Sequence, residues 1–151
     1  FYAGSGAYAN GFFVEYRKTS AVDKLVFMDG GGIETMSILN GGNIGIGTAS
    51  PDAKLAVKGT IHAQEVKVDL SVPGPDYVFA NEYRLPTIEE VKAFIQENHH
   101  LPEVPTAKEM KNNGVNVGEM NMLLLKKVEE LTLYVIQLKS ELDEVKKKVK
   151  D

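Results

Sequence analysis

Cysteine is absent from the 151 residues of this chain. The protein therefore has no disulfide, no thiolate metal site and no thiol nucleophile. No run of 18 apolar residues occurs either, so we expect no membrane-spanning helix and no membrane insertion. Basic residues are not in excess, because the net charge is −4 and the isoelectric point is about 5.4. This charge balance argues against general nucleic-acid binding.

Motifs for small-molecule chemistry are also lacking. The glycine stretches do not have the order or the strand–helix setting of a phosphate-binding loop. His99 and His100 are adjacent, so their rings diverge, and no third ligand follows at a recognisable spacing; we interpret them as the C-terminal cap of a helix. The acidic pairs Glu89–Glu90 and Glu129–Glu130 diverge in the same way, and we expect both on solvated helix faces. The sequence thus predicts no catalytic residue, no metal and no cofactor.

Glycine is scarce after residue 60, because 11 of the 14 glycines precede that position. In this first part, short β-type runs alternate with turn signals such as Asn10-Gly11 and Asn40-Gly41-Gly42, a pattern that predicts an all-β region. The expected strands are Phe12–Lys18, Leu25–Met28, Ile33–Leu39, Asn43–Gly47, Lys54–Val57 and Thr60–Val68. Glycine alternates with isoleucine in the fourth of these, which suits close approach of backbones near a threefold axis or in an intertwined β-prism.

Helical signals replace the β pattern beyond the proline-rich stretch Ser71–Asp76, which ends the sheet region. Thr87, Thr106 and Asn116 each precede a glutamate by three residues, and we interpret all three as capping boxes that open helices. The chain begins with Phe1 and shows no signal-peptide pattern, so we expect a piece of a longer protein. We predict three parts: a β region in residues 1–71, small helices in 72–118, and a long helix in 119–151.

The long helix carries a heptad seam, in which apolar residues recur at alternating steps of four and three. The seam consists of Leu124, Val128, Leu131, Val135, Leu138, Leu142, Val145 and Val149, preceded by the polar, register-fixing Asn121. Such a seam predicts a parallel coiled coil with identical helices. The alternative is one amphipathic helix within a monomeric bundle. Valine at position a with leucine at position d favours two strands by itself.

Aromatic residues near the start of the chain are the candidates for a contact surface. Aromatic side chains on β tips can stack on sugars, but the same side chains can fill the core of a trimer. The candidates for surface contact are Tyr2, Tyr8, Phe12 and Tyr16.

Two stretches resemble known families. NGGNIGIGTASPDAKLAVKGTIHA, residues 40–63, resembles the GIGT-x-x-P-x-x-KL-x-V-x-G segment of phage tail fibres and of fibre-like surface proteins of bacteria, notably Bacteroidota. Residues 75–139, which begin PDYVFANEYRLPTIEEVKAF, resemble the C-terminal domain that follows such segments. That domain is similar to the endosialidase-type intramolecular chaperones at the ends of trimeric fibres, which assemble as trimers and seed folding of the β-stalk before them.

The resemblance implies an extracellular homotrimer on a bacterial surface, a phage or an injection device, with a receptor or glycan as a further partner. Its fold would be α+β: a glycine-rich all-β trimeric stalk or prism, small helices, and a long parallel coiled-coil helix. We side with three chains because Leu142 with Val145 dilutes the dimer pattern and because the strands must share the axis of the coil. Some relatives cut themselves at a Ser-Asp dipeptide; this chain has none, and Ser71 at the corresponding junction precedes Val72. We therefore expect a non-enzymatic module, with self-cleavage near Ser71 as the alternative.

Overall fold

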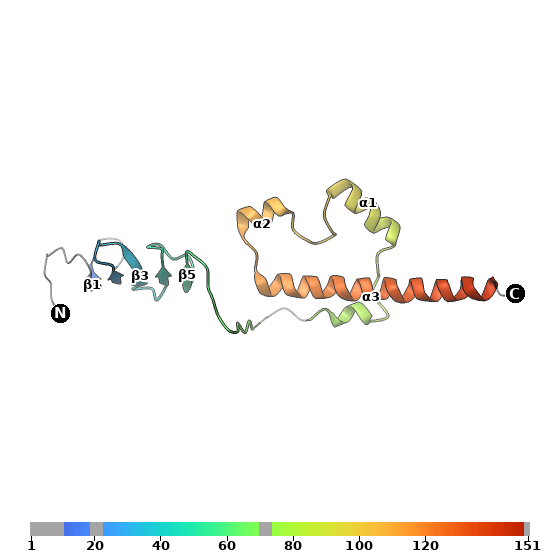
Figure 1. The fold of residues 1–151 in the computed structure, drawn as a ribbon, viewed down its shortest axis with the longest axis horizontal. Helices are drawn as coiled ribbons and strands as arrows, with labels where there is room; N and C mark the ends of the chain where they lie inside the picture. The colour runs from blue at the N-terminus through green and yellow to red at the C-terminus, as the bar shows by residue number, and fades with distance from the viewer. Residues whose placement is uncertain (1–10, 19–22, 70–73, 150–151) are drawn as a thin grey trace. The chain divides into compact units, whose positions relative to one another are not determined.

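A computed structural model describes residues 11–18, 23–69 and 74–149. The chain is a mixture of strands and helices, in which a five-stranded sheet is followed by small helices and a long C-terminal helix (Figure 1). This order confirms the mixed fold that the sequence predicts. The chain divides into two compact units, Phe1–Val66 and Lys67–Asp151. The finer boundaries expected at residues 71 and 118 stay predictions.

The first unit contains one sheet with its strands in sequence order. The strands are β1 (Phe13–Arg17), β2 (Lys24–Met28), β3 (Glu34–Leu39), β4 (Ile44–Ile46) and β5 (Leu55–Val57). Neighbours from β1 to β4 are antiparallel, whereas β4 and β5 run parallel. Four of these strands lie within a predicted β-type run, and β2 begins one residue before the predicted run Leu25–Met28. The sequence predicts the positions of β4 and β5 but not that these two strands run parallel.

The sixth predicted strand, Thr60–Val68, is wrong. This segment forms no strand and pairs with no other described strand. Its apolar side chains are exposed, including Ile61 and Val66. A strand needs a neighbour that accepts and donates its backbone hydrogen bonds, and a segment without one leaves those groups to water.

Position 45 in β4 requires glycine, because the backbone of Thr48 lies too close for a side chain there. The parallel pairing of β4 with β5 needs a crossover, residues 47–54, which folds back over the sheet. A Cβ atom at Gly45 would lie 2.2 Å from the carbonyl oxygen of Thr48 and 3.3 Å from Oγ of Ser37. A close approach of backbone at this segment therefore exists within one chain. The threefold axis and the intertwined β-prism stay predictions.

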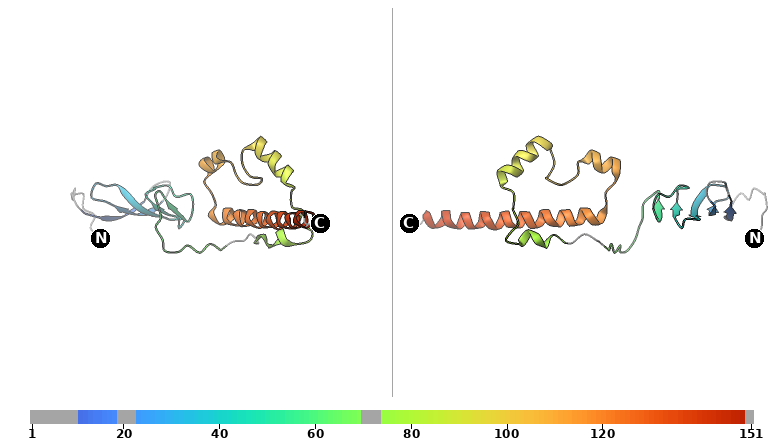
Figure 2. Two further views of the ribbon diagram at one scale, coloured as in Figure 1. Left: turned by 45° about the vertical axis from the view of Figure 1, so that its right-hand side comes forward. Right: turned by 180° about the vertical axis from the view of Figure 1, so that it is seen from behind.

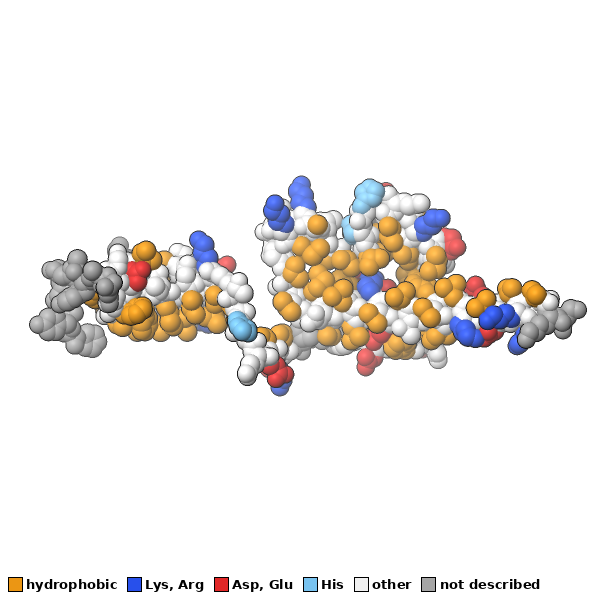
Figure 3. Space-filling view, in the orientation of Figure 1, with side chains coloured by type: hydrophobic (Ala, Val, Ile, Leu, Met, Phe, Trp, Pro, Cys, Tyr) orange, Lys and Arg blue, Asp and Glu red, His pale blue; other side chains and the backbone are white. Residues whose placement is uncertain are grey.

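The strand register places apolar side chains on one face of the sheet. Val14 pairs with Phe27, and Phe27 with Met36, so these residues form one row across the face. The other apolar residues of this face are Tyr16, Leu25, Ile38, Ile44, Ile46, Leu55 and Val57. No other described element packs on it, and Val14 is 57% and Tyr16 58% exposed. Figure 3 shows hydrophobic side chains gathered along one side of the sheet.

The second unit contains a short 3₁₀ helix and three α-helices. They are η1 (Pro75–Phe79), α1 (Ile88–Asn98), α2 (Ala107–Asn113) and α3 (Val117–Lys148). η1 packs on α3, with Pro75 and Val78 buried. Among the described residues, no helix has both the length and the apolar character needed to cross a membrane.

The predicted capping boxes form at two of the three sites. The hydroxyls of Thr87 and Thr106 accept from the backbone N–H groups three residues on, and the glutamates there accept in return from the threonine N–H groups. The third prediction is wrong in its detail. Asn116 is the N-cap of α3, but its side chain accepts no capping bond and instead donates from Nδ2 to Glu119 at 2.9 Å.

Candidate functional site

The long helix α3 exposes its apolar residues in the single chain. The seam side chains from Leu124 to Val149 are between 49% and 80% exposed. The exposed members are Leu124, Val128, Leu131, Val135, Leu138, Leu142, Val145 and Val149; Asn121 is exposed as well. A helix of a monomeric protein normally turns its apolar stripe toward the core. In the monomeric-bundle alternative, the chain would bury this stripe against its own core. The single chain instead leaves the stripe exposed.

Off the seam, α3 buries charged residues. Glu129 and Glu130 are each only 8% exposed, and the side chains of Lys126 and Lys127 are 14% exposed. The expectation that Glu129–Glu130 lies on a solvated face is therefore wrong. The pair is covered because η1 and the segments around α1 pack against this part of α3, which the periodicity of α3 alone does not indicate.

The buried charges belong to a polar clamp, a name used here for Tyr83, Glu103, Lys126, Lys127 and Glu130. The Tyr83 hydroxyl donates a hydrogen bond to Glu130, and Lys127 Nζ lies 2.9 Å from the Glu130 carboxylate. Nζ of Lys126 and of Lys127 lie 2.6 and 2.8 Å from the Glu103 carboxylate. The clamp thus fixes two segments that are distant in sequence to the middle of α3.

Electrostatics in the clamp follow from burial and from these partners. Burial and the hydrogen bond to Glu130 raise the pKa of the Tyr83 hydroxyl, so it stays a donor. Burial by itself lowers the pKa of Lys127, but the hydrogen bonds to Glu103 and Glu130 outweigh it and raise that pKa. Glu129 lies beside the clamp, and its Oε2 atom is buried with no hydrogen-bond partner among the described residues. These hydrogen bonds and ion pairs join Tyr83 and Glu103 to α3.

We expect the clamp to weaken in acid. Burial by itself raises the pKa of Glu103, but the hydrogen bonds from Lys126 and Lys127 outweigh it and lower the pKa from 4.5. A carboxyl with a lowered pKa stabilises the folded chain above about pH 4.5 and loses that contribution as the pH falls through its folded-state pKa. Glu103→Gln should therefore reduce stability by less than about 1 kcal/mol near pH 7, since the carboxylate is half exposed, and by almost nothing near pH 3.

The measurement is thermal unfolding of wild type and Glu103→Gln across this pH range. Glu97→Gln, at an exposed position of α1, is the control and should follow wild type throughout. A Glu103→Gln deficit of the same size near pH 3 as near pH 7 would contradict this role of Glu103.

Two arches stand over α3. The chain between η1 and α3 rises into α1, returns to α3 at Glu103, and rises again into α2; the views in Figures 1 and 2 agree on this. Neither α1 nor α2 contacts another described element. Both ends of the first arch are fixed to α3, because the Tyr134 hydroxyl donates to the Pro86 carbonyl at 2.6 Å and Glu103 binds Lys126 and Lys127.

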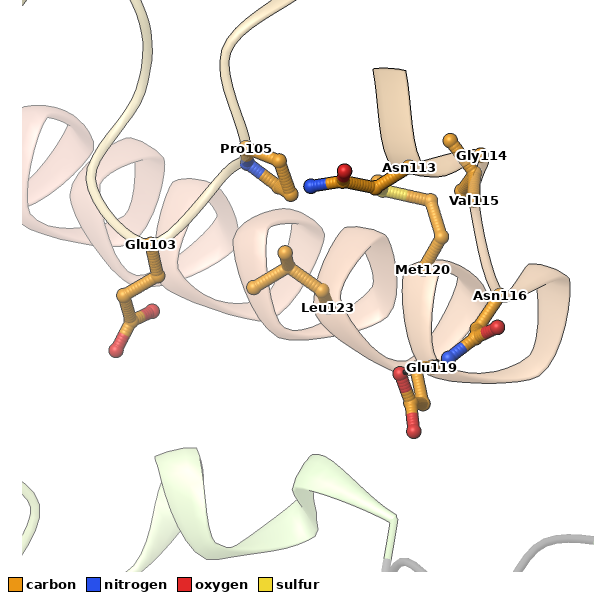
Figure 4. Close-up of a pocket in the computed structure, with 9 residues that line it drawn as sticks. All are labelled: Glu103, Pro105, Asn113, Gly114, Val115, Asn116, Glu119, Met120 and Leu123. Atoms are coloured by element: carbon orange, nitrogen blue, oxygen red, sulfur yellow. Dashed lines mark hydrogen bonds between the residues drawn. The ribbon is translucent and has the colours of Figure 1, made fainter. Parts of the chain in front are cut away.

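The arches enclose hollows next to α3. A hollow of about 290 Å³ lies beneath α2, where Pro105 and Met120 lie near Leu123 (Figure 4). Two polar side chains that line this hollow already bind each other, since Asn116 donates a hydrogen bond to Glu119. A larger and more apolar hollow of about 600 Å³ lies between α1 and α3.

The two adjacent histidines have different surroundings at the end of α1. His99 is the C-cap of α1 with φ of 60°, and His100 stacks edge-on against Phe94. Within residues 11–18, 23–69 and 74–149 no three His, Cys, Asp or Glu side chains are grouped to hold a metal ion.

Two of the four contact aromatics, Phe12 and Tyr16, lie among the described residues. Phe12 is 86% exposed before β1, whereas Tyr16 lies on the apolar sheet face and donates to Asp23 at 2.9 Å. Tyr2, Tyr8 and Ser71 lie outside the described residues, so the predictions made for them stay predictions.

Sequence reasoning missed the polar clamp altogether. Charges at Lys126, Lys127 and Glu130 resemble the solvated side of any coiled-coil helix, and nothing near Tyr83 or Glu103 marks them as partners. The one available signal was the group of bulky residues off the seam in the first half of α3, such as Leu133 and Tyr134, which indicated that this half is covered.

Comparison of the chain with protein-family models gives no match, and comparison with curated proteins gives none either. A function can therefore be inferred only from the geometry of the chain itself. Helix α3 exposes the leucines and valines of its seam, whereas it largely buries lysines and glutamates that lie off the seam.

Proposed function

We propose that this chain is a structural and interaction module at the C-terminal end of a homotrimeric fibre. In this proposal three α3 helices associate in parallel through the seam, and the association brings three β regions together so that they fold. The module is not an enzyme. It acts outside the cell, on a phage, an injection device or a bacterial surface, and it contributes to binding of a receptor or another surface.

The proposal rests on the exposure of apolar seam residues on α3, a helix that at the same time buries charged residues. Eight seam residues from Leu124 to Val149 remain about half exposed or more in one chain, and exposing apolar surface costs free energy that association recovers. Side-by-side association in register would cover the whole stripe. A coiled coil is the arrangement that a repeat of 3.5 residues selects.

The apolar face of the sheet supports the same conclusion independently. It belongs to the other compact unit, and no other described element covers it. An exposed apolar patch of this extent is typical of an interaction surface. Three such sheets can turn their apolar faces toward one axis, which makes the coil and the sheet compatible with one symmetry. Self-cleavage near Ser71 and sugar binding are favoured by no observation among the described residues.

The test is the molar mass of the purified chain by light scattering, repeated after serial dilution. A mass of three times 16.6 kDa that survives dilution is the expected result. A stable mass of two chains would contradict the threefold symmetry and support the preference of valine at a and leucine at d for dimers. A monomer at every concentration would contradict the proposal as a whole.

A further inference from the structure

We propose that α1 is an arm that packs on the α3 helix of a second copy of this chain. The second helix would lie in the hollow between α1 and α3 of the first copy, so that α1 covers it from outside. This inference rests on the proposed function, because it requires that the chains associate through the seam. It goes further by assigning an intermolecular contact to α1, which the heptad pattern of α3 does not involve.

α1 has an apolar stripe that its own chain covers only in part. Ile88, Val91 and Ile95 follow at helical spacing, and Ile88 is 51% and Ile95 39% exposed. No residue of α1 is buried, and α1 contacts no other described element. An amphipathic helix this short is not stable in water without a surface to pack on. The stripe therefore indicates a partner for α1.

The arch holds α1 at a distance from its own α3. The Pro86 carbonyl before α1 accepts from Tyr134, and Glu103 after α1 binds Lys126 and Lys127. With both ends attached in this way, the hollow of about 600 Å³ beneath α1 remains. The space is formed before association, which lowers the entropic cost of filling it.

The walls of the hollow connect it to the seam. Leu124, Val128 and Leu131 line it from α3, and Ile88 and Val91 line it from the arm. The same three α3 residues are seam positions, so a helix that packs on the seam of this copy necessarily stands beside α1. The apolar surface continues along α3 beyond the hollow through Val135 and Leu138, so a second helix could pack on α3 over a length greater than the hollow.

The register identifies which side of the second helix meets the arm. Lys127 and Tyr134, which also line the hollow, are at position g, so α1 stands on the g side of its own α3. In a parallel coiled coil the g side of one helix faces the e side of the next. Leu125 is at position e and Ile136 lies next to that side, and these two apolar residues off the seam are 41% and 57% exposed. The arm of the neighbouring copy would cover them.

A small-molecule ligand fits the hollow less well than a helix does. Ligand pockets orient their ligand with a few free polar groups. The charged groups lining this hollow are Lys127 and Glu130, and both are already bound in the polar clamp. The apolar residues on the e side of α3 would also stay exposed with a small ligand in place.

The first experiment uses the absence of cysteine in the chain. A double variant, Val91→Cys with Leu125→Cys, is treated with a short bis-maleimide, and the products are separated on a denaturing gel. We expect covalent dimers and trimers, because each arm would reach the next chain. The single variants Val91→Cys and Leu125→Cys are controls and should give no covalent trimer. An intrachain product alone, or no product, would overturn the inference.

The second experiment changes the arm without changing the seam. Ile88→Asp with Ile95→Asp should raise the concentration at which the oligomer dissociates by about tenfold or more. Ala93→Asp with Gln96→Asp places the same charges on the outer side of α1 and should leave dissociation unchanged. Equal effects of the two pairs would overturn the inference.

Light scattering on each untreated variant separates the two proposals. An intact oligomer that gives only intrachain products overturns the arm and leaves the trimeric module standing. A wild-type chain that is monomeric overturns the module, and the arm with it.

Discussion

Leu131→Asp combined with Leu138→Asp is expected to convert the oligomer into monomers. Both leucines are 60% exposed in the single chain, so association removes most of that surface from water. Burying a leucine side chain contributes about 1.5–3 kcal/mol, and the loss of two per chain corresponds to a decrease of roughly a thousandfold or more in the association constant. Aspartates at these positions would also repel one another across the proposed threefold axis.

The single chain itself should survive this change. Leu131 and Leu138 are exposed, and neither is part of the polar clamp. Circular dichroism should therefore retain the helical signal while light scattering reports a mass near 16.6 kDa. Gln137→Asp with Ser140→Asp adds the same charge at exposed positions outside the seam and should remain oligomeric. An unchanged oligomer in the seam variant would contradict the proposed role of α3.

Gly45→Ala is expected to unfold the sheet of the first unit. The added Cβ would lie 2.2 Å from the carbonyl oxygen of Thr48, a backbone atom that cannot move without displacing the crossover between β4 and β5. Overpacking of this kind costs about 3 kcal/mol or more, which is large for a sheet whose buried hydrophobic residues are Val26 and Met28.

Hydrogen exchange of the amides in β2 to β4 measures this effect. Protection should fall by about a hundredfold or more in Gly45→Ala. Gly41→Ala is the matched control, because a Cβ atom there meets nothing within 4 Å, and its exchange should follow wild type. Protection in β2 to β4 that is equal in the two variants would contradict the packing role of Gly45. The helices of the second unit serve as an internal reference, since their exchange should not change.

Much of the fold was predictable because its signals are local. Turn residues delimit the five strands, and the capping boxes at Thr87 and Thr106 involve residues only three positions apart. The Asn116 box and the strand over Thr60–Val68 were wrong for related reasons. At Asn116 the amide found another acceptor in Glu119, and at Thr60–Val68 no partner strand was present. A local sequence pattern indicates which structure a segment can form. Whether that structure forms depends on the groups available to hydrogen-bond with it.

The sequence by itself determined the position and spacing of the seam, because a repeat of 3.5 residues depends only on residues that are neighbours on one helix. Only the tertiary structure decided that α3 buries Glu129 and Glu130 off the seam and that α1 stands apart over a hollow. Those features depend on Tyr83, 47 residues from Glu130, and on Glu103, 23 residues from Lys126. Hydrogen bonds over such separations arise from the path of the chain in space, and side-chain periodicity carries no information about that path.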